Sequence, residues 1–391
     1  MDSDIILVVV VFTALAFDFT NGFHDTANAV ATSVSTYALS PRMAVLLASV
    51  LNFVGAFISL KVAATVGSGI VESSAATTTV VFAGLVGAIA WNLITWWFGL
   101  PSSSSHALIG GLVGSTLAAA GTSGVDFTGL VDKVLIPGLV APFLAFAVAG
   151  LAILIAYRVC RRLRPGPVNR GFRLGQLVSG SMFSLAHGTN DAQKTMGIIT
   201  LALVAHGNLP STGFDVPTWV VVSSATAIAL GTYSGGWRII KTMGSKIIKM
   251  DPAQGFSSQG SGAAVVLTAS HLGYPLSTTH VISGGIMGAG AAKRFSAVRW
   301  GVAGNIAVAW LLTLPAAAAI GAAAYGVISI FGPGAGGPLV VTVCCIALLL
   351  AIFGRRAVNN RQKRLEAGIA AGLDPLAEAG VEPEPKVEVK A

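Results

Sequence analysis

One short pattern occurs twice in this chain, and a chain that repeats itself in this way is expected to fold as two related halves. Residues 99–106 read Gly-Leu-Pro-Ser-Ser-Ser-Ser-His, and residues 273–280 read Gly-Tyr-Pro-Leu-Ser-Thr-Thr-His. A motif with an aspartate precedes each copy. Residues 21–28 read Asn-Gly-Phe-His-Asp-Thr-Ala-Asn, and residues 187–194 read His-Gly-Thr-Asn-Asp-Ala-Gln-Lys. Two halves of this kind, with acidic residues and Pro-interrupted polar clusters inside apolar sequence, are typical of secondary transporters.

The composition indicates an all-α, polytopic membrane protein. Hydrophobic residues make up 54% of the 391 residues and charged residues only 10%, whereas an ordinary soluble domain has about 25% charged residues. Apolar runs of about 20 residues, long enough for a helix to cross a bilayer, recur from end to end. The net charge of +8 does not indicate nucleic acid binding, because the basic residues lie between the apolar runs without an aromatic and basic platform. We also expect no cofactor.

Four regions follow from the distribution of apolar and basic residues. We expect a first membrane repeat at residues 1–157, a basic connector at 158–173, a second repeat at 174–354 and a disordered tail at 355–391. In each repeat we expect a broken helix at the Asp motif and a re-entrant hairpin at the Pro-Ser/Thr pattern. The positive-inside rule places the connector and the C-terminus in the cytoplasm. With that orientation the two hairpins enter from opposite sides, so the repeats would be inverted.

Asp25 and Asp191 are the first candidates for function, because a carboxylate in an apolar segment costs at least about 2.5 kcal/mol on membrane insertion. Asn21 and Asn28 flank Asp25 at helical spacing, and Asn190 adjoins Asp191. Carboxylate and amide oxygens are the ligands that small cations prefer. These residues therefore predict a site for a coupling ion or a proton, with the two aspartates as candidate metal ligands. The alternative is a structural polar network.

Two clusters of hydroxyl side chains are the candidate anion site. They are Ser103, Ser104 and Ser105 in the first half and Ser277, Thr278 and Thr279 in the second. Asn28 and Lys194 are expected to complete the anion site. Each cluster follows a proline, which interrupts a helix, and can cap a new helix expected from Ala107 or from Val281 onward. A helix N-terminus in a membrane offers N–H groups and a positive dipole end to phosphate, sulfate or carboxylate. The alternative is that the hydroxyls only satisfy the backbone of a kinked span.

Histidines and one lysine complete the set of candidates. A histidine titrates near neutral pH, so His24, His106, His187 and His280 could relay protons. His24 beside Asp25 is the better candidate for proton exchange, and His106 and His280 are equally compatible with packing. Lys194 follows Asp191 by three residues, so it either pairs with that carboxylate or attracts the anion. No Gly-x-Ser-x-Gly elbow is present, so we do not expect an enzyme. An intramembrane hydrolase with a hairpin serine would not explain two matching halves.

Taken in order, the four motifs resemble the inorganic phosphate transporter (Pit) family over about residues 5–354. The resemblance implies a symporter with two inverted repeats, re-entrant hairpins, and phosphate and cations bound between the halves of each subunit in a homodimer. The acidic motif of the family falls on Asp25 and Asn28 in the first repeat and on Asn190 and Asp191 in the second. Its hairpin hydroxyls fall on the six serines and threonines named above.

The first acidic motif is similar to that of the bacterial low-affinity branch of this family. Members commonly have Asn where this chain has His24, and some have Glu where it has Asn52. The resemblance implies a plasma-membrane (bacterial inner-membrane) protein that imports inorganic phosphate with protons rather than sodium, with phosphate carried as a complex with Mg²⁺ or another divalent metal. Sodium coupling, sulfate transport and a channel-like anion conduit stay open as alternatives.

Overall fold

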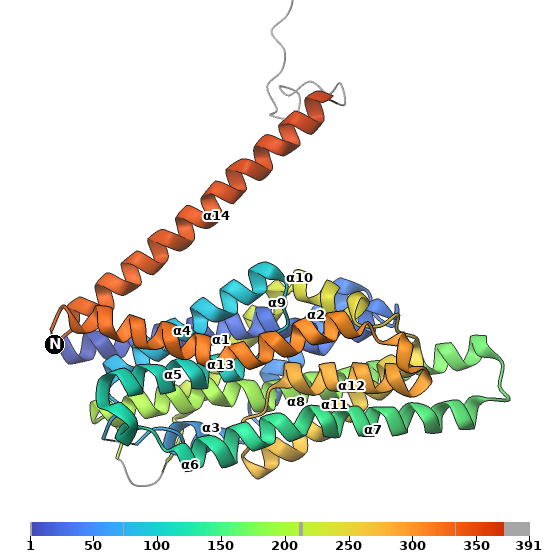
Figure 1. Cartoon of the computed structure of the whole chain (residues 1–391), viewed down its shortest axis with the longest axis horizontal. Coiled ribbons are helices and arrows are strands. Elements are labelled where there is room, and N and C mark those ends of the chain that lie inside the picture. Colours follow the sequence, from blue (N-terminus) through green and yellow to red (C-terminus); the bar gives the residue numbers. More distant parts are fainter. Residues whose placement is uncertain (1, 73, 211–213, 333, 371–391) are drawn as a thin grey trace, which may run out of the picture. The chain divides into compact units, whose positions relative to one another are not determined.

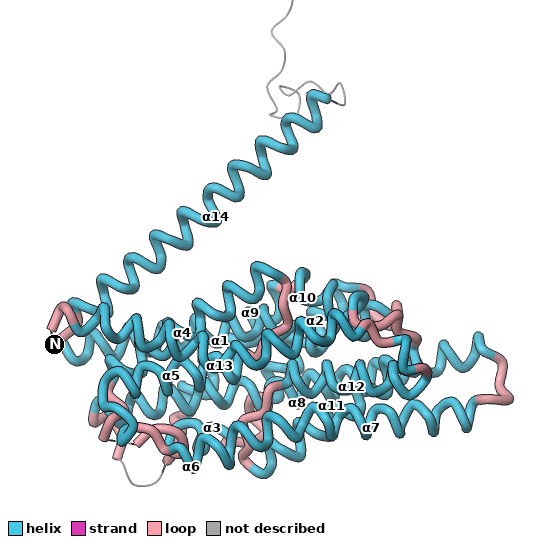
Figure 2. The backbone as a smooth tube through the Cα atoms, viewed as in Figure 1, coloured by secondary structure: helices cyan, strands magenta, loops and turns pink. Residues whose placement is uncertain are grey.

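The computed structural model describes residues 2–72, 74–210, 214–332 and 334–370, and these are almost entirely helical (Figure 1, Figure 2). The β-structure of this described part is a single bridge between Val71 and Val125. Six of the described helices are long and apolar enough to cross a membrane. The prediction of an all-α, multi-pass membrane protein is therefore confirmed.

The first half contains α1 to α7. Their bounds are α1 Asp2–Ser35, α2 Pro41–Gly55, α3 Lys61–Ser68, α4 Thr78–Phe98, α5 Ser104–Ala120, α6 Phe127–Leu130 and α7 Ile136–Cys160. A 3₁₀ turn at Gly121–Gly124 and a π-helical turn at Val131–Leu135 join the last three. The turn between α7 and α8 occupies residues 161–164, so most of the predicted connector is helical.

The second half contains α8 to α13, and α14 ends the described chain. Their bounds are α8 Pro165–His206, α9 Thr218–Ser234, α10 Trp237–Lys241, α11 Pro252–Leu272, α12 Thr278–Lys293, α13 Trp300–Ser329 and α14 Gly336–Ala370. Residues from 339 onward form a separate unit. Its helix continues from 355 to Ala370, where a disordered tail was predicted, because Ala, Arg, Gln and Glu in this stretch are good helix formers. The rest of the predicted tail, residues 371–391, lies outside the described residues.

Residues up to Pro338 form the first unit of the chain. In this unit, the main helix contacts of the first half have counterparts in the second half. Helix α1 packs against α4 and α9, and its counterpart α8 packs against α11 and α2. The α4–α5 pair is covered by α13 from the second half, and the α11–α12 pair is covered by α7 from the first. Each half therefore buries part of the other. The polar motifs of both halves come together as a result.

The two Pro-Ser/Thr segments form matching turns, between α4 and α5 and between α11 and α12, so that each is the tip of a pair of packed helices, a helical hairpin. Gly99 ends α4 and Gly273 ends α11, each in the left-handed region with φ of 66° and 85°. A glycine adopts this conformation without a Cβ clash, which explains why both copies begin with one. Ser103 then caps α5 by accepting a hydrogen bond from the N–H of His106 (3.0 Å), and Ser277 caps α12 by accepting from the N–H of His280 (3.3 Å). Capping by both clusters is confirmed, and each helix begins three residues earlier than predicted.

The helices that carry the Asp motifs are unbroken, so the prediction of a broken helix at each motif is wrong. Helix α1 runs through Asp25 and α8 runs through Asp191. The motif glycines permit close packing instead of a break. A Cβ at Gly22 would lie 2.4 Å from a carbonyl oxygen of α9, and a Cβ at Gly188 would lie 2.1 Å from a carbonyl oxygen of α2. The positions of the predicted breaks are thus points of helix contact.

Candidate functional site

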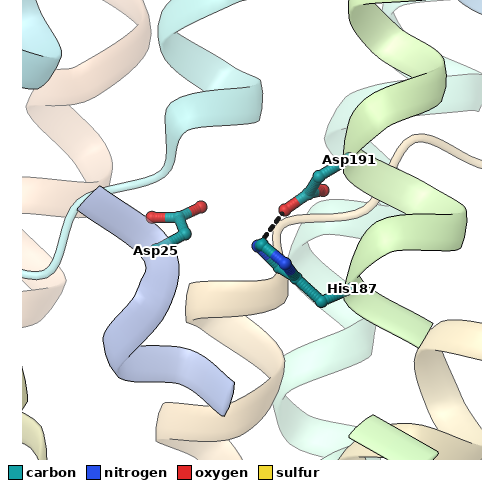
Figure 3. Close-up of side chains that lie close together, drawn as sticks. All are labelled: Asp25, His187 and Asp191. Carbon is teal, nitrogen blue, oxygen red and sulfur yellow. Dashed lines mark ion pairs between the residues drawn. The ribbon is translucent and has the colours of Figure 1, made fainter. Parts of the chain in front are cut away.

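The candidate site lies where α1 and α8 meet the tips of the two hairpins. Asp25 projects from α1 toward Asp191 and His187 on the facing turn of α8 (Figure 3). All three side chains are buried, as are the hydroxyl clusters before α5 and α12. The structure thus brings residues from both motif pairs into one region. Contacts of Asp25, Asn28 and Lys194 cross between the halves, whereas most of the others stay within one half.

Asp25 contacts a histidine of its own half and a threonine of the other half. Its Oδ1 lies 2.6 Å from Nδ1 of His24, and it accepts a hydrogen bond of 3.4 Å from the hydroxyl of Thr279. The other ring nitrogen of His24 lies 3.2 Å from the hydroxyl of Thr95 and 3.3 Å from that of Ser102. His24 therefore links Asp25 to the first hairpin. This position suits a proton-exchanging pair.

Both carboxylate oxygens of Asp191 have partners. Oδ2 lies 2.9 Å from Nε2 of His187 and accepts a hydrogen bond of 3.0 Å from the hydroxyl of Thr278. Oδ1 pairs with the ammonium of Lys194. Asp191 is thus held by one cation, one imidazole and one hydroxyl. The contact of His187 with Asp191 was not predicted, although its spacing of four on a helix could have indicated it.

Lys194 joins the two hairpin tips. Besides Asp191, its ammonium donates to the hydroxyl of Ser105 at 2.5 Å and to the carbonyl oxygen of Leu276 at 2.7 Å. Ser105 also donates to Leu276 at 3.0 Å, so the first hairpin is tied directly to the second. Pairing with Asp191, one of the two interpretations of Lys194, is present. The same ammonium also reaches the hydroxyl cluster of the first hairpin.

The asparagines of the two motifs have different surroundings. Asn28 donates to the hydroxyls of Thr278 (3.2 Å) and Thr279 (2.9 Å), so it reaches the hairpin of the other half. Asn190 donates to the hydroxyl of Ser270 (2.8 Å) and the carbonyl oxygen of Tyr274 (3.1 Å), both beside the second hairpin. Asn21 makes no contact with Asp25 that the structure describes. Its amide lies beside Asp18 instead, one turn earlier on α1.

Each hairpin contains a histidine that packs against aromatic rings and a serine that caps a helix. The rings of His106 and His280 meet edge to face with centroids 4.8 Å apart, and the ring of Trp310 lies 4.1 Å from that of His280. Ser103 and Ser277 act as helix caps. Ser104 makes a long contact with His24, since its hydroxyl oxygen lies 3.5 Å from Nδ1. The hydroxyls in direct contact with charged groups are therefore those of Ser105, Thr278 and Thr279.

The site offers one arrangement that could hold a metal ion. One ligand atom from each of Asp25, His187 and Asp191 lies within 4.8 Å of the other two (Figure 3). Carboxylate oxygens suit hard cations, and an added imidazole widens the choice to transition metals. In the described state His187 and Lys194 already satisfy Asp191. A cation at this position would replace some of those contacts.

Sequence comparison matches the chain to known proteins over most of its length. Residues 21–167 and 161–321 match the phosphate transporter family. A protein of Mycobacterium tuberculosis named a probable low-affinity inorganic phosphate transporter is 50% identical over 381 residues, covering 95% of this chain and 91% of that protein. A protein of Bacillus subtilis with the same name is 46% identical, covering 83% of this chain and 98% of that protein.

A solved structure has the same overall arrangement of helices. It is described as the sodium-dependent phosphate transporter, and it superimposes with a TM-score of 0.72 at 26% sequence identity. The match covers 83% of this chain and 99% of that one. The similarity in fold therefore extends over most of both chains.

Proposed function

The chain belongs to the phosphate transporter family, which is a family of membrane transporters and not of enzymes, and from this premise we propose that it is a secondary active symporter that imports inorganic phosphate. Phosphate would enter across the plasma membrane and bind between the hairpin tips. The observation that carries the proposal is the position of Lys194, whose ammonium contacts the Ser105 hydroxyl of the first hairpin and the Leu276 carbonyl oxygen of the second. It also pairs with Asp191, which accepts from the hydroxyl of Thr278. A buried ammonium and hydroxyls at two helix N-termini together form a suitable site for an oxyanion.

The proposal includes an inverted repeat with re-entrant hairpins. Residues 1–157 and 174–354 would be the repeats, residues 158–173 the connector, and residues 355–391 a cytoplasmic tail. Support comes from the helix contacts, which are preserved when the halves are exchanged. In folds of this kind the substrate binds at the repeat interface, and the halves move against each other to give alternating access. A homodimer is proposed from family resemblance.

Coupling would arise from competition for the same hydroxyl groups. In the described state Thr279 donates to Asp25 and Thr278 donates to Asp191. A hydroxyl has one proton, so it cannot donate to a carboxylate and to phosphate at once. A cation or proton that neutralises a carboxylate would free its threonine and lower the repulsion of the anion. Cation binding and phosphate binding would then each favour the other, as linkage requires.

The coupling ion in this proposal is a proton, held by the pair His24–Asp25. Their contact of 2.6 Å allows a proton to move between carboxylate and imidazole. Sodium is the second candidate, because the solved structure with the same fold is described as sodium-dependent. The cluster of Asp25, His187 and Asp191 would hold the divalent metal, such as Mg²⁺, if phosphate enters as a metal complex.

The decisive experiment is uptake of labelled phosphate into proteoliposomes. Proton and sodium gradients are imposed separately, with and without Mg²⁺ and with excess sulfate. We expect accumulation against the phosphate gradient that collapses with a protonophore and resists sulfate. Simple equilibration would indicate a conduit, and complete competition by sulfate would indicate a sulfate carrier.

Removing the hairpin hydroxyls should weaken phosphate binding from either half. One double variant combines Ser104→Ala with Ser105→Ala, and the other combines Thr278→Val with Thr279→Val. Both helix caps stay intact in these variants. A lost hydrogen bond to a charged group costs about 1.5 to 3 kcal/mol, so each double variant should raise the apparent KM for phosphate at least about tenfold.

The matched control removes hydroxyls that bond only within their own helix or turn. Ser68, Ser123 and Ser329 are exposed and donate to backbone carbonyls three or four residues earlier. Their alanine variants should leave the apparent KM unchanged. Unchanged apparent affinity in both hairpin double variants would mean that phosphate binds elsewhere.

Replacing His24 should flatten the pH dependence of uptake. Imidazole changes its charge between about pH 5 and 8, whereas an amide does not. For the parent we expect uptake to rise as the pH falls through this range, with each phosphate species held at constant concentration, and for His24→Asn a flatter profile. His271→Asn is the control, because His271 is exposed. Profiles of equal slope for parent and His24→Asn would contradict proton exchange at His24.

A further inference from the structure

An apolar groove lies where α7 ends and α8 begins. Its volume is about 570 Å³, within the range of about 300 to 1,000 Å³ that is usual for ligand sites. One face of α8 supplies much of the lining, at helical intervals of one, three and four residues, and this face includes Pro167, Val168, Gly171 and Phe172. Phe256 of α11 also lines the groove, with its ring 5.7 Å from that of Phe172. The groove therefore offers mostly carbon surface to a ligand.

Gly171 keeps the groove open. A Cβ at this position would have no atom within 4 Å, so a larger side chain here would occupy the groove. The next glycine of this face has a different role. A Cβ at Gly175 would lie 2.9 Å from the ring of Phe256, so Gly175 allows α8 to pack closely against α11. The space is thus left at Gly171, near the turn between α7 and α8.

The turn beside the groove carries arginines without counter-ions. Arg161 and Arg162 lie in the turn itself, and Arg164 at its end lines the groove. All three are exposed, and within the described part of the chain none of them has an ion pair or a side-chain hydrogen bond. The sequence contains no acidic residue between Asp132 and Asp191. The positive charge of this turn is therefore available to a ligand.

The acidic residue at the start of α11 does not neutralise these arginines. Asp251 precedes Phe256 by five residues on the helix that lines the groove. Its Oδ2 accepts a hydrogen bond of 2.8 Å from the hydroxyl of Tyr157 and lies 3.0 Å from the ammonium of Lys293. These partners tie α7, α11 and α12 together. Asp251 is thus already engaged.

The groove adjoins the end of a membrane-length helical segment. Phe127–Cys160 is long and apolar enough to cross a bilayer, and Arg161 follows it directly. In Figure 1 the connection between α7 and α8, drawn in green, extends beyond the neighbouring helices. Basic residues just beyond a spanning helix meet the lipid headgroups, and anionic lipids attract them. An apolar groove at this level is within reach of acyl chains.

We propose that this groove binds one anionic phospholipid. The phosphate would contact Arg161 and Arg164, and an acyl chain would lie along the apolar face of α8. Guanidinium groups suit a phosphodiester because they present paired N–H donors to its oxygens. A soluble anion would leave the apolar lining in water. A second copy of the chain is also a poorer occupant, because a symmetric contact would place these arginines against the same arginines.

The test is native mass spectrometry of the purified full-length protein in detergent, titrated with dioleoyl phosphatidylglycerol. We expect one lipid to bind more tightly than any further lipid. Dioleoyl phosphatidylcholine should bind at least about tenfold more weakly, because the arginines repel its trimethylammonium group. The double variant Arg161→Gln with Arg164→Gln should lower the affinity for phosphatidylglycerol at least about tenfold, because it removes charge-assisted hydrogen bonds.

The matched control removes the same charge from other faces of α8. Arg170 and Arg173 are exposed, and their positions on the helix point away from the face of Gly171. Arg170→Gln with Arg173→Gln should bind phosphatidylglycerol like the parent. Equal loss of affinity in both double variants would show only a general attraction between a basic protein and an anionic lipid, and it would contradict the site.

A second variant fills the groove and leaves the arginines in place. Gly171→Leu should lower the affinity for phosphatidylglycerol at least about tenfold. Gly326→Leu is its control, because a Cβ at this glycine of α13 also meets no atom within 4 Å. A ligand that binds only the folded protein raises its denaturation temperature. Phosphatidylglycerol should therefore stabilise the parent and Gly326→Leu, and it should not stabilise Gly171→Leu.

Three results would overturn the proposal. They are equal affinity of the parent for the two lipids, displacement of phosphatidylglycerol by equimolar glycerophosphoglycerol, which has the headgroup without acyl chains, and parental affinity in both Gly171→Leu and the variant of Arg161 and Arg164. A folding defect in one of these variants leaves the other decisive. Lipid binding requires no phosphate transport, so these results are independent of the function proposed above.

Discussion

Asp25→Asn and Asp191→Asn are each expected to reduce phosphate accumulation in proteoliposomes by at least about tenfold, while the protein still inserts and folds. Truncating one charge of a buried hydrogen-bonded pair costs 2 to 5 kcal/mol or more, and about 1.4 kcal/mol is already tenfold. The amide keeps the shape of the carboxylate and can still accept from Thr279 or Thr278. It cannot be neutralised by a cation, so the hydroxyl is no longer released in exchange for one.

A loss of phosphate accumulation in these variants must be distinguished from a loss of folding. Asp132→Asn makes the same chemical change at an exposed position, and it should accumulate phosphate like the parent. Elution volume and thermal stability in detergent report the folded state of each variant. If Asp25→Asn and Asp191→Asn both accumulate phosphate at the parental rate and with the parental pH dependence, the carboxylates are structural and the proposed exchange of hydroxyl partners is wrong.

The two motif copies predicted much of this site because they supply equivalent positions. Aligning Asp25 with Asp191 places Asn28 opposite Lys194. Both residues reach hydroxyls of the hairpin that belongs to the other half, Thr278 and Thr279 for Asn28 and Ser105 for Lys194. The crosswise contacts could not be read from the sequence. They depend on α1 packing against α9 and on α8 packing against α2.

The contacts that the sequence analysis missed are those of residues without an equivalent in the other half. Asp18 aligns with Ser184, so no repeat marked it. His187 aligns with Asn21, and the two have different partners: His187 contacts Asp191, whereas Asn21 lies beside Asp18. The first half therefore has an excess of negative charge, and the second half balances its carboxylate with Lys194. This difference arises within an otherwise repeated fold.

The unbroken Asp-motif helices show why polar sequence alone was misleading. Asn, Asp and Gly favour turns when their side chains compete with the backbone for hydrogen bonds. In α1 and α8 the side chains of Asp25 and Asp191 have partners on neighbouring elements instead. Tertiary contacts therefore override the local preference. The hairpin ends were predictable because a left-handed glycine and a capping serine act locally.

Lys194→Met is expected to have the second large effect, on stability as well as on transport. Removing one partner of a buried ion pair costs about 3 to 5 kcal/mol, because the other charge stays buried and unpaired. Here the carboxylate of Asp191 would keep only His187 and Thr278 as partners. We expect a lower thermal denaturation temperature in detergent and loss of phosphate accumulation. Lys293→Met is the matched control, because Lys293 pairs with Asp251 at 3.0 Å at the exposed surface, where an ion pair is worth about 0 to 1 kcal/mol.

The double variant Asp191→Asn with Lys194→Met distinguishes a structural role of the lysine from a transport role. Removing both charges leaves no unpaired ion, so the denaturation temperature should recover most of the loss caused by Lys194→Met alone. Phosphate accumulation should stay absent, because the ammonium that contacts Ser105 and Leu276 is gone. Recovery of accumulation together with stability would show that Lys194 only balances Asp191. In that case the anion would be held by the hairpin hydroxyls and backbone without a buried cation.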